Sequence, residues 1–418
     1  MPKRKRWTPV KGTANRVSDP LERLLLGGFD LTGRVLFGVA RLGRQPAAAT
    51  FDRSTIREVL VLRLDRIGDA IMSLPALGEL RAALPKARIR LAVGRWSESV
   101  VRHAPVDEVL VWSAPWVGRA AEGAESTSTL FARARALGRV GLDLALDLQG
   151  DVRASLLMWL ARARFRGGYA NTGGGWLLTH VIPLDETVSW IEQNRRAVEA
   201  VLGPPNRRMT VDPLTPADRD FGRRFYEGLG ASLRRPLVGM HPAGGRPVKQ
   251  WGVERWAAVA ARLQREFGAT VLITGSAADR PLAEALAAAL PEAPIDTTGR
   301  LGVRESMAVI EGLDLFLSPD TGPMHMACAV DTPSVSVFGP SDPARYFSGG
   351  AGAPGSRHVV VRPELWCSPC NLIRKPPTEC AGPAMPECLA LVSVEAVHRE
   401  AVRLLRAAGF AGLGRNPQ

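Results

Sequence analysis

The chain has 418 residues, which is enough for two domains with complete hydrophobic cores. No stretch approaches the roughly 18 to 20 consecutive apolar residues of a transmembrane helix, so we expect a soluble or at most peripheral protein. The 54 Lys and Arg residues exceed the 41 Asp and Glu residues and give a formal charge of +13. This excess favours an anionic partner, such as nucleic acid, an acidic membrane surface or a phosphorylated substrate, but solvated helix faces explain it equally well.

The first 53 residues differ from the rest of the chain. They begin with a basic tail, and Leu21–Leu42 is predicted as an amphipathic helix that glycines, Asp30 and Arg34 interrupt. A basic tail followed by such a helix either lies on an anionic membrane surface or packs on the main body. All five cysteines come after position 327, and no cleavable signal peptide is recognisable. We therefore expect a reducing, cytoplasmic location.

Residues 54–212 are predicted as a first α/β domain. Short apolar runs alternate with helical stretches, which is typical of βα units and a mostly parallel, doubly wound sheet. The predicted strands are Val59–Leu64, Ile89–Val93, Val109–Trp112 and Leu142–Leu148. The predicted helices are Ala70–Leu84, Ser97–His103, Thr127–Leu137, Val152–Ala163 and Val188–Val201.

A linker helix region, 213–235, precedes a second domain, 236–410, that repeats this architecture. Its predicted strands are Leu237–His241, Thr270–Thr274, Leu313–Ser318, Pro333–Phe338 and His358–Arg362. Its predicted helices are Glu254–Phe267, Pro281–Leu290, Arg304–Gly312 and Pro323–Ala329. Two doubly wound domains facing a cleft should bind ligands at the carboxyl ends of their strands.

Two strand ends of the first domain carry polar groups at a helix start. Gly68 allows a tight turn after the first strand, and Asp69 falls in the first turn of the next helix. Its carboxylate is either an N-terminal cap or a general base for an incoming hydroxyl. A second junction, 147–155, carries Arg153, which either meets an acidic acceptor or is an exposed helix arginine.

The junction after the strand at 313–317 has the features of an anion site. Asp320 or Thr321 can cap the helix that follows. Pro323 gives up no hydrogen bond in the first turn, and Gly322 lets a ligand approach the backbone. The oriented N–H groups and the positive end of the helix dipole suit a diphosphate, although an ordinary capped turn has the same sequence features.

A lysine and a group of cysteines complete the candidate residues. Lys249 follows a Gly-Gly loop at a strand end, so it either places a charge against a bound anion or is an ordinary surface lysine. Cys328 is predicted to pack in the core. The other cysteines form C-x2-C-x9-C-x7-C, which predicts a structural zinc site, with disulfides or free thiols as alternatives. They are Cys367, Cys370, Cys380 and Cys388.

Five separated motifs stand in a definite order along the chain. They are R-L-D-R-I-G-D-A with L-P-A-L, H-P-A-G-G-R-P-V-K-Q-W-G-V-E-R-W-A, I-T-G-S-A-A-D, S-P-D-T-G-P-M-H-M-A and F-G-P-S-D-P. In this order they resemble the glycosyltransferase family that contains the ADP-heptose:lipopolysaccharide heptosyltransferases, over about Val59 to Leu405. The resemblance implies a GT-B fold, with two doubly wound α/β domains, and a metal-independent, inverting transfer from a nucleotide-diphosphate sugar.

The resemblance also implies a role for individual residues. Asp69 matches the base that deprotonates the acceptor hydroxyl, and one carboxylate suffices because the leaving diphosphate needs charge stabilisation rather than a proton donor. Lys249 matches a lysine that contacts the donor's phosphates. The other donor-site positions are Asp320, Thr321, Gly322, Pro323, Gly275, Ser276 and His325, of which the last either reaches the donor or is structural. The expected acceptor-site positions are Gly68, Gln149 and Arg153.

The implied partners are an ADP-activated sugar and an anionic, lipopolysaccharide-type acceptor, with no required cofactor. The protein is then expected in the cytoplasm, in peripheral contact with the cytoplasmic face of the inner membrane. Two alternatives stay open: a related transferase with another nucleotide sugar or glycan acceptor, and a non-catalytic protein that binds an anionic membrane or nucleic acid. No nucleic-acid-binding motif is recognisable, so we do not expect a nucleic-acid partner.

Overall fold

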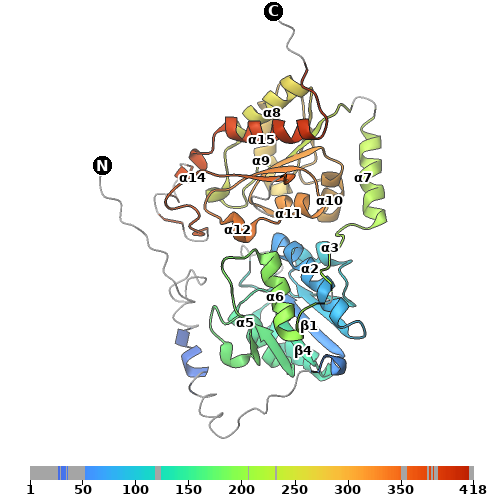
Figure 1. Cartoon of the computed structure of the whole chain (residues 1–418), viewed down its shortest axis with the longest axis vertical. Coiled ribbons are helices and arrows are strands. Elements are labelled where there is room, and N and C mark those ends of the chain that lie inside the picture. Colours follow the sequence, from blue (N-terminus) through green and yellow to red (C-terminus); the bar gives the residue numbers. More distant parts are fainter. Residues whose placement is uncertain are drawn as a thin grey trace, which may run out of the picture. The chain divides into compact units, whose positions relative to one another are not determined.

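A computed structural model describes most of the chain: residues 27–28, 30–33, 35, 52–117, 124–205, 207–230, 233–349, 355–373, 376–377, 380 and 385–413. The chain divides into two compact units, each described by itself, which we call the N-terminal unit (Met1–Val211) and the C-terminal unit (Asp212–Gln418). Figure 1 shows helices and a sheet in each unit. Among the described residues, no helix is both long and apolar enough to cross a membrane.

The N-terminal unit contains a parallel sheet of six strands in the order β3-β2-β1-β4-β5-β6. The chain therefore steps outward from the centre on one side and then on the other, which confirms the predicted doubly wound sheet. The point where the order reverses lies between β1 and β4, where Leu62 pairs with Asp147. The strands are β1 (Glu58–Arg63), β2 (Arg88–Val93), β3 (Glu108–Val111), β4 (Leu144–Asp147), β5 (Phe165–Gly168) and β6 (His180–Val181).

Three helices of this unit begin at a residue whose side chain offers a capping oxygen. Ser126, Asp151 and Ser189 each accept a hydrogen bond from a backbone N–H of the first turn that follows. Figure 1 shows α2 and α6 side by side, and they pack on each other. The helices are α2 (Ile67–Ala83), α3 (Arg95–Val101), α4 (Thr127–Leu137), α5 (Val152–Leu160) and α6 (Trp190–Leu202), with 3-10 turns at Arg53–Thr55, Gly138–Val140 and Gly175–Leu177.

A short helical piece before this sheet packs on the N-terminal unit. The Asp30 Oδ1 atom accepts a 2.7 Å hydrogen bond from the Gly174 backbone N–H, and Gly33 lies against the Trp176 ring. Two apolar side chains of the same piece point to solvent, Leu31 at 66% and Val35 at 56% exposure. The rest of the predicted helix and the basic tail lie outside the described residues.

The C-terminal unit repeats the topology with the strand order β12-β11-β10-β7-β8-β9. All its pairings are parallel, and the order reverses between β7 and β10. The two sheets therefore have the same winding, with β7 and β10 in the places of β1 and β4. The strands are β7 (Leu237–Met240), β8 (Thr270–Ile273), β9 (Ile295–Asp296), β10 (Leu315–Pro319), β11 (Ser334–Val337) and β12 (His358–Val361).

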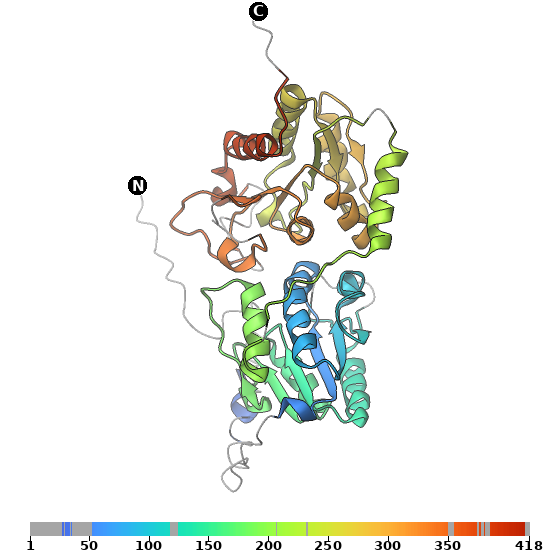
Figure 2. The same ribbon diagram turned by 45° about the vertical axis from the view of Figure 1, so that its right-hand side comes forward.

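The core of this unit is centred on two buried tryptophans, Trp251 and Trp256, whose rings meet edge to face at 4.6 Å between centroids. Figures 1 and 2 both show α8 and α15 side by side, and the two helices pack on each other. The helices are α7 (Pro216–Gly228), α8 (Val253–Phe267), α9 (Arg280–Ala288), α10 (Val303–Glu311), α11 (Gly322–Ala329), α12 (Pro343–Tyr346), α14 (Glu387–Ala390) and α15 (Val394–Ala407), with 3-10 turns at Pro247–Lys249 and Ala277–Asp279.

Candidate active site

The reversal point of the N-terminal sheet carries the predicted base. Asp69 is the third residue of α2, its side chain is 24% exposed, and Gly68 beside it is buried. The Asp69 Oδ2 atom lies 3.4 Å from the Arg66 backbone N–H, which makes the carboxylate a weak cap. Both interpretations from the sequence are therefore compatible with its position, since a contact this long leaves the carboxylate able to accept a proton.

A buried arginine lies behind this carboxylate. Arg63 ends β1, and its side chain is only 1% exposed. Its Nε atom donates to the Asp69 backbone carbonyl at 3.1 Å, and Nη1 donates to the Leu148 carbonyl. The guanidinium also pairs with two carboxylates, through Nε to Asp65 Oδ1 at 3.0 Å and through Nη2 to Asp69 Oδ1 at 3.5 Å. Neither Arg63 nor Asp65 was predicted from the sequence, although the charged pair in R-L-D at a strand end was a signal.

Three carboxyl groups therefore gather around one guanidinium. Burial raises the pKa of Asp65 to about 8, with repulsion from Asp69 and Asp147 adding to the effect and Arg63 opposing it. Burial likewise raises the pKa of Asp147 to about 7, against backbone hydrogen bonds from Gln149, Gly150 and Asp151 that lower it. At neutral pH this edge of the sheet therefore holds at least one carboxyl group that is protonated for much of the time.

The β4–α5 junction holds the residues predicted for the acceptor. The Gln149 Oε1 atom is buried and has no hydrogen-bond partner among the described residues, so it can accept one from a ligand. Arg153 forms a double contact with Asp151, at 2.8 Å from Nε to Oδ1 and 2.6 Å from Nη2 to Oδ2. Its guanidinium also lies 5.0 Å from the centre of the Trp116 ring. The predicted exposed helix arginine is thus wrong, and Arg153 is held in place by its neighbours.

The reversal point of the C-terminal sheet brings Lys249 and Asp320 together, 71 residues apart in the chain. Lys249 follows β7 and Asp320 follows β10, and these two strands are neighbours. The Lys249 Nζ atom pairs with Asp320 Oδ2 and also donates to the Asp320 carbonyl at 3.2 Å. The side chains are 11% and 7% exposed, so Lys249 is not an ordinary surface lysine.

The ion pair stands at the start of α11. Burial alone would raise the pKa of Asp320, but Lys249, the Ser341 hydroxyl and His325 together hold this pKa below its ordinary value. Thr321 occupies the N-cap position without making a side-chain cap, because its hydroxyl is directed to the Pro319 carbonyl at 3.3 Å. The prediction that Asp320 or Thr321 caps this helix is therefore wrong. With Gly322 and Pro323 following, the helix offers an N-terminus that no side chain caps.

The remaining donor-site candidates flank this centre in the same unit. His325 is buried, and its Nδ1 atom lies 2.5 Å from the Ser348 hydroxyl oxygen. Gly275 and Ser276 follow β8, where Ser276 donates through its backbone N–H and its hydroxyl to Asp279, at 2.8 and 2.7 Å. Asp279 thus has a clear structural task in this turn, while Gly275 and Ser276 lie at the strand edge that also carries Lys249.

Among the described residues the four clustered cysteines form no disulfide, and Cys328 packs beside Met324 and Phe338 as predicted. Burial raises the pKa of Cys388 to about 11, with repulsion from the other three thiols of the cluster adding to the effect. Among the described residues, no three His, Cys, Asp or Glu side chains are placed to hold a metal ion. The structural zinc therefore stays a prediction.

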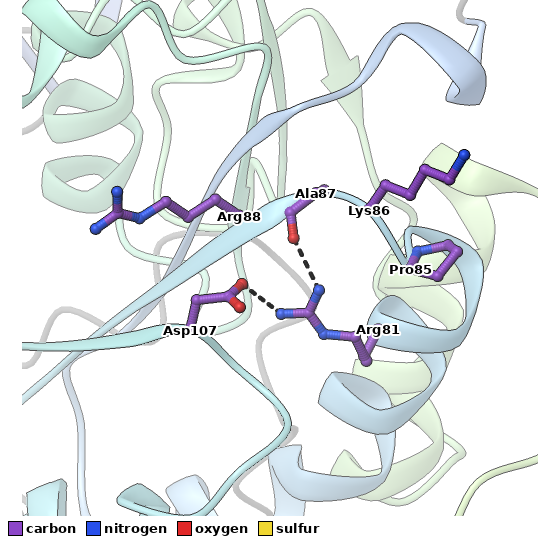
Figure 3. A pocket seen from close by; sticks show the side chains of 6 residues that line it. All are labelled: Arg81, Pro85, Lys86, Ala87, Arg88 and Asp107. Atoms are coloured by element: carbon purple, nitrogen blue, oxygen red, sulfur yellow. Dashed lines mark hydrogen bonds and ion pairs between the residues drawn. The ribbon is translucent and has the colours of Figure 1, made fainter.

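Surface hollows of the N-terminal unit lie away from these residues. One of about 410 Å³ is lined by Arg81, Lys86, Arg88 and Asp107, near the amino ends of β2 and β3 (Figure 3). Arg81 pairs with Asp107 there and donates to the Ala87 carbonyl at 2.8 Å. This hollow contains none of the site residues predicted from the sequence. Arg81, which lines it, is already paired with Asp107.

Comparisons with known proteins identify the family of this chain. The profile of glycosyltransferase family 9 (heptosyltransferase) matches residues 130–379. Lipopolysaccharide heptosyltransferase 1 of Pseudomonas aeruginosa is 27% identical over 320 residues, which cover 75% of this chain and 85% of that protein.

Two solved structures show the same fold. The glycosyltransferase family 9 protein of Veillonella parvula has a TM-score of 0.69 at 23% identity, over 84% of this chain and 98% of that one. The Escherichia coli heptosyltransferase WaaC with ADP-2-deoxy-2-fluoro heptose has a TM-score of 0.58 at 19% identity, over 83% and 99%. The GT-B type of fold expected from the sequence is thereby confirmed.

Two doubly wound units, with a carboxylate at one reversal point and a lysine beside an uncapped helix at the other, are the parts of a sugar-transferring enzyme. The chain belongs to glycosyltransferase family 9, the heptosyltransferase family. It is therefore a glycosyltransferase, as the resemblance implied.

Proposed function

We propose that this enzyme transfers a heptose from ADP-heptose to an inner-core acceptor of lipopolysaccharide. The observation that carries the proposal is the Lys249–Asp320 pair at the uncapped start of α11, in a chain of the heptosyltransferase family. Support for the sugar comes from the Pseudomonas aeruginosa relative, which is a lipopolysaccharide heptosyltransferase, and from the WaaC structure, which holds an ADP-heptose analogue.

In the proposed reaction, Asp69 accepts the proton of the acceptor hydroxyl as that oxygen attacks the anomeric carbon. The new bond from the acceptor oxygen to the sugar forms while the bond from the sugar to the diphosphate breaks, and ADP leaves with the bonding electrons. Attack opposite the leaving group inverts the anomeric centre. The Gln149 Oε1 atom, buried without a partner, can accept a hydrogen bond from an acceptor hydroxyl.

The charge of the leaving ADP is proposed to be stabilised by the C-terminal unit without a metal ion. An ammonium group has three N–H donors, and Asp320 takes two of those of Lys249. One donor is left for a phosphate oxygen, and the first-turn N–H groups of α11 add the positive end of a helix dipole. These groups act where negative charge develops as the donor breaks.

We also propose that the enzyme works in the cytoplasm, in peripheral contact with the inner membrane. The net charge of +13 favours an anionic surface. Leu31 and Val35 are spaced four residues apart, so they share one helix face, and both are exposed. That face can enter the headgroup region while Asp30 keeps the helix on its own unit.

Isothermal titration with ADP-heptose tests the donor, with ADP, UDP and GDP as comparators. We expect ADP to bind more tightly than UDP and GDP, and ADP-heptose to bind at least as tightly as ADP. Tighter binding of UDP or GDP would overturn the heptosyl assignment and favour another nucleotide sugar. Binding of DNA without binding of any nucleotide sugar would reject the enzyme proposal as a whole.

We propose the structural zinc site from a separate observation, the closeness of four cysteines. The thiols of Cys367, Cys370 and Cys380 lie near enough to Cys388 to raise its pKa. The Leu372 backbone N–H lies 3.5 Å from the Cys370 sulfur, which places this thiol beside a backbone donor. We expect elemental analysis of the purified protein to give about one zinc per chain, and less than a tenth of that after Cys367 and Cys370 are both changed to serine. Metal-free protein with four reactive thiols would reject the site.

A further inference from the structure

We propose that Arg63 is a positioning residue for the Asp69 base, to which it is joined at both the backbone and the carboxylate. This inference rests on the proposed function of Asp69 and extends it to a residue that cannot itself touch the acceptor. With 1% of its side chain exposed, Arg63 acts only through its neighbours.

The contacts of Arg63 join three elements that meet at the reversal point of the sheet. Its backbone belongs to β1, its Nε atom donates to the Asp69 carbonyl in α2, and Nη1 donates to the Leu148 carbonyl that follows β4. Its guanidinium carbon also lies 5.9 Å from the centre of the Trp190 ring at the start of α6. These contacts fix the planar guanidinium in position. The guanidinium then holds the first helical turn of α2 in place.

The contact between Arg63 and the Asp69 carboxylate suits a general base better than a purely structural ion pair. The Arg63 Nη2 atom lies 3.5 Å from Asp69 Oδ1, and the Arg66 N–H lies 3.4 Å from Oδ2. A close double contact, such as that of Asp151 with Arg153 at 2.8 and 2.6 Å, would occupy both oxygens of the carboxylate. At Asp69 the contacts are longer, so both oxygens of the carboxylate stay available for a proton.

Asp65 is the competing partner of the same guanidinium. The charged groups that act on it include Arg63, Asp69 and Asp147, and Trp96 and Ser97 of α3 contact its backbone carbonyl. Burial raises the pKa of Asp65, so its carboxyl competes less strongly for the Arg63 charge than an ordinary aspartate would. The Asp65→Asn variant should therefore behave like the protein in which the Asp65 carboxyl is neutral.

The test compares Arg63→Met, Arg63→Lys, Asp65→Asn and the double variant Arg63→Met/Asp65→Asn in a transfer assay over a range of pH. We expect Arg63→Met to lower kcat about 10- to 100-fold with KM for both substrates nearly unchanged. We also expect the acid limb of its pH profile to move to higher pH, because a cation 3.5 Å from the base is lost. Arg63→Lys, which keeps the charge but not the planar fork, should recover part of both effects.

The double variant separates two roles of Arg63. If Arg63 only neutralised Asp65, removing both charges would restore activity, and that result would overturn the proposal. We expect instead that the double variant stays as slow as Arg63→Met, while Asp65→Asn alone stays within about threefold of the natural enzyme at pH 7. Arg81→Met, which breaks an arginine–aspartate pair in the same unit (Figure 3), is the matched control and should leave the acid limb in place.

A carbon NMR titration of the aspartate carboxyl groups tests the role of Arg63 without a measurement of catalysis. The Asp69 signal, assigned by its loss in Asp69→Asn, should titrate at higher pH in Arg63→Met than in the natural protein. If Arg63→Met does not fold, Arg63→Lys takes its place in both measurements. An unmoved Asp69 signal rejects the role of Arg63, whereas a natural enzyme without sugar transfer rejects the proposed function.

Discussion

Replacing Asp69 with asparagine is expected to slow sugar transfer by about 100- to 10,000-fold, the usual contribution of a general base. Asparagine has nearly the same shape, so the contacts of Arg63 to the backbone of position 69 should persist. The donor groups assigned here belong to the C-terminal unit, whereas Asp69 belongs to the N-terminal unit. The dissociation constant for ADP should therefore change by less than about threefold, and the loss should appear in kcat.

Single-turnover transfer and ADP titration measure these two effects on the same protein. Asp107→Asn is the matched control, because Asp107 precedes β3 at the opposite edge of the same sheet and also pairs with an arginine. It should retain transfer activity. If Asp69→Asn kept full activity, or lost ADP binding in proportion to transfer, Asp69 would not be the base.

Replacing Lys249 with methionine is expected to have two large effects. First, donor binding should weaken about 10- to 100-fold, since a charged hydrogen bond to phosphate contributes about 1.5 to 3 kcal/mol. Second, the protein should lose about 3 to 5 kcal/mol of unfolding free energy, because Asp320 is left ionised and buried without its cation. Lys86→Met, on the exposed surface in Figure 3, is the control that should change neither quantity.

A second substitution separates stability from binding. In Lys249→Met/Asp320→Asn no buried charge is left without a partner, so much of the stability should return. Donor affinity should not return, because the ammonium group is still missing. Donor affinity that recovered together with the melting temperature would show that Lys249 supports the fold and does not bind phosphate.

Much of the fold could be predicted because apolar runs and helical periods were clear. The strands around Val59, Ile89 and Leu237 appear within one or two residues of their predicted bounds. Three short strands were missed: β5, β6 and β9. The first contains Phe165-Arg-Gly-Gly168 and the other two have only two residues each, so none shows the β-branched run that identifies a strand. The helix α15 was missed although Ser393 and the apolar positions from Val397 to Leu405 were a signal.

The candidate site was predictable only where topology brings strand ends together. Lys249 and Asp320 follow neighbouring central strands, so their closeness follows from the doubly wound order. The pairing of Arg153 with Asp151 was not predictable, since an arginine two residues from an acid more often extends into solvent. The burial of Arg63 among carboxylates was hidden for another reason: Asp147 lies in a strand 84 residues further along the chain.

The pairing of Lys249 with Asp320 also restricts how this chain can change over evolution. A mutation of either residue alone leaves the other charge buried, so the intermediate would be poorly stable whatever its effect on sugar transfer. The two positions should therefore be inherited together, and a lineage that abandons one should have replaced both. The turn at Gly275 and Ser276 is held mainly through Asp279, so we expect substitutions there to cost less stability.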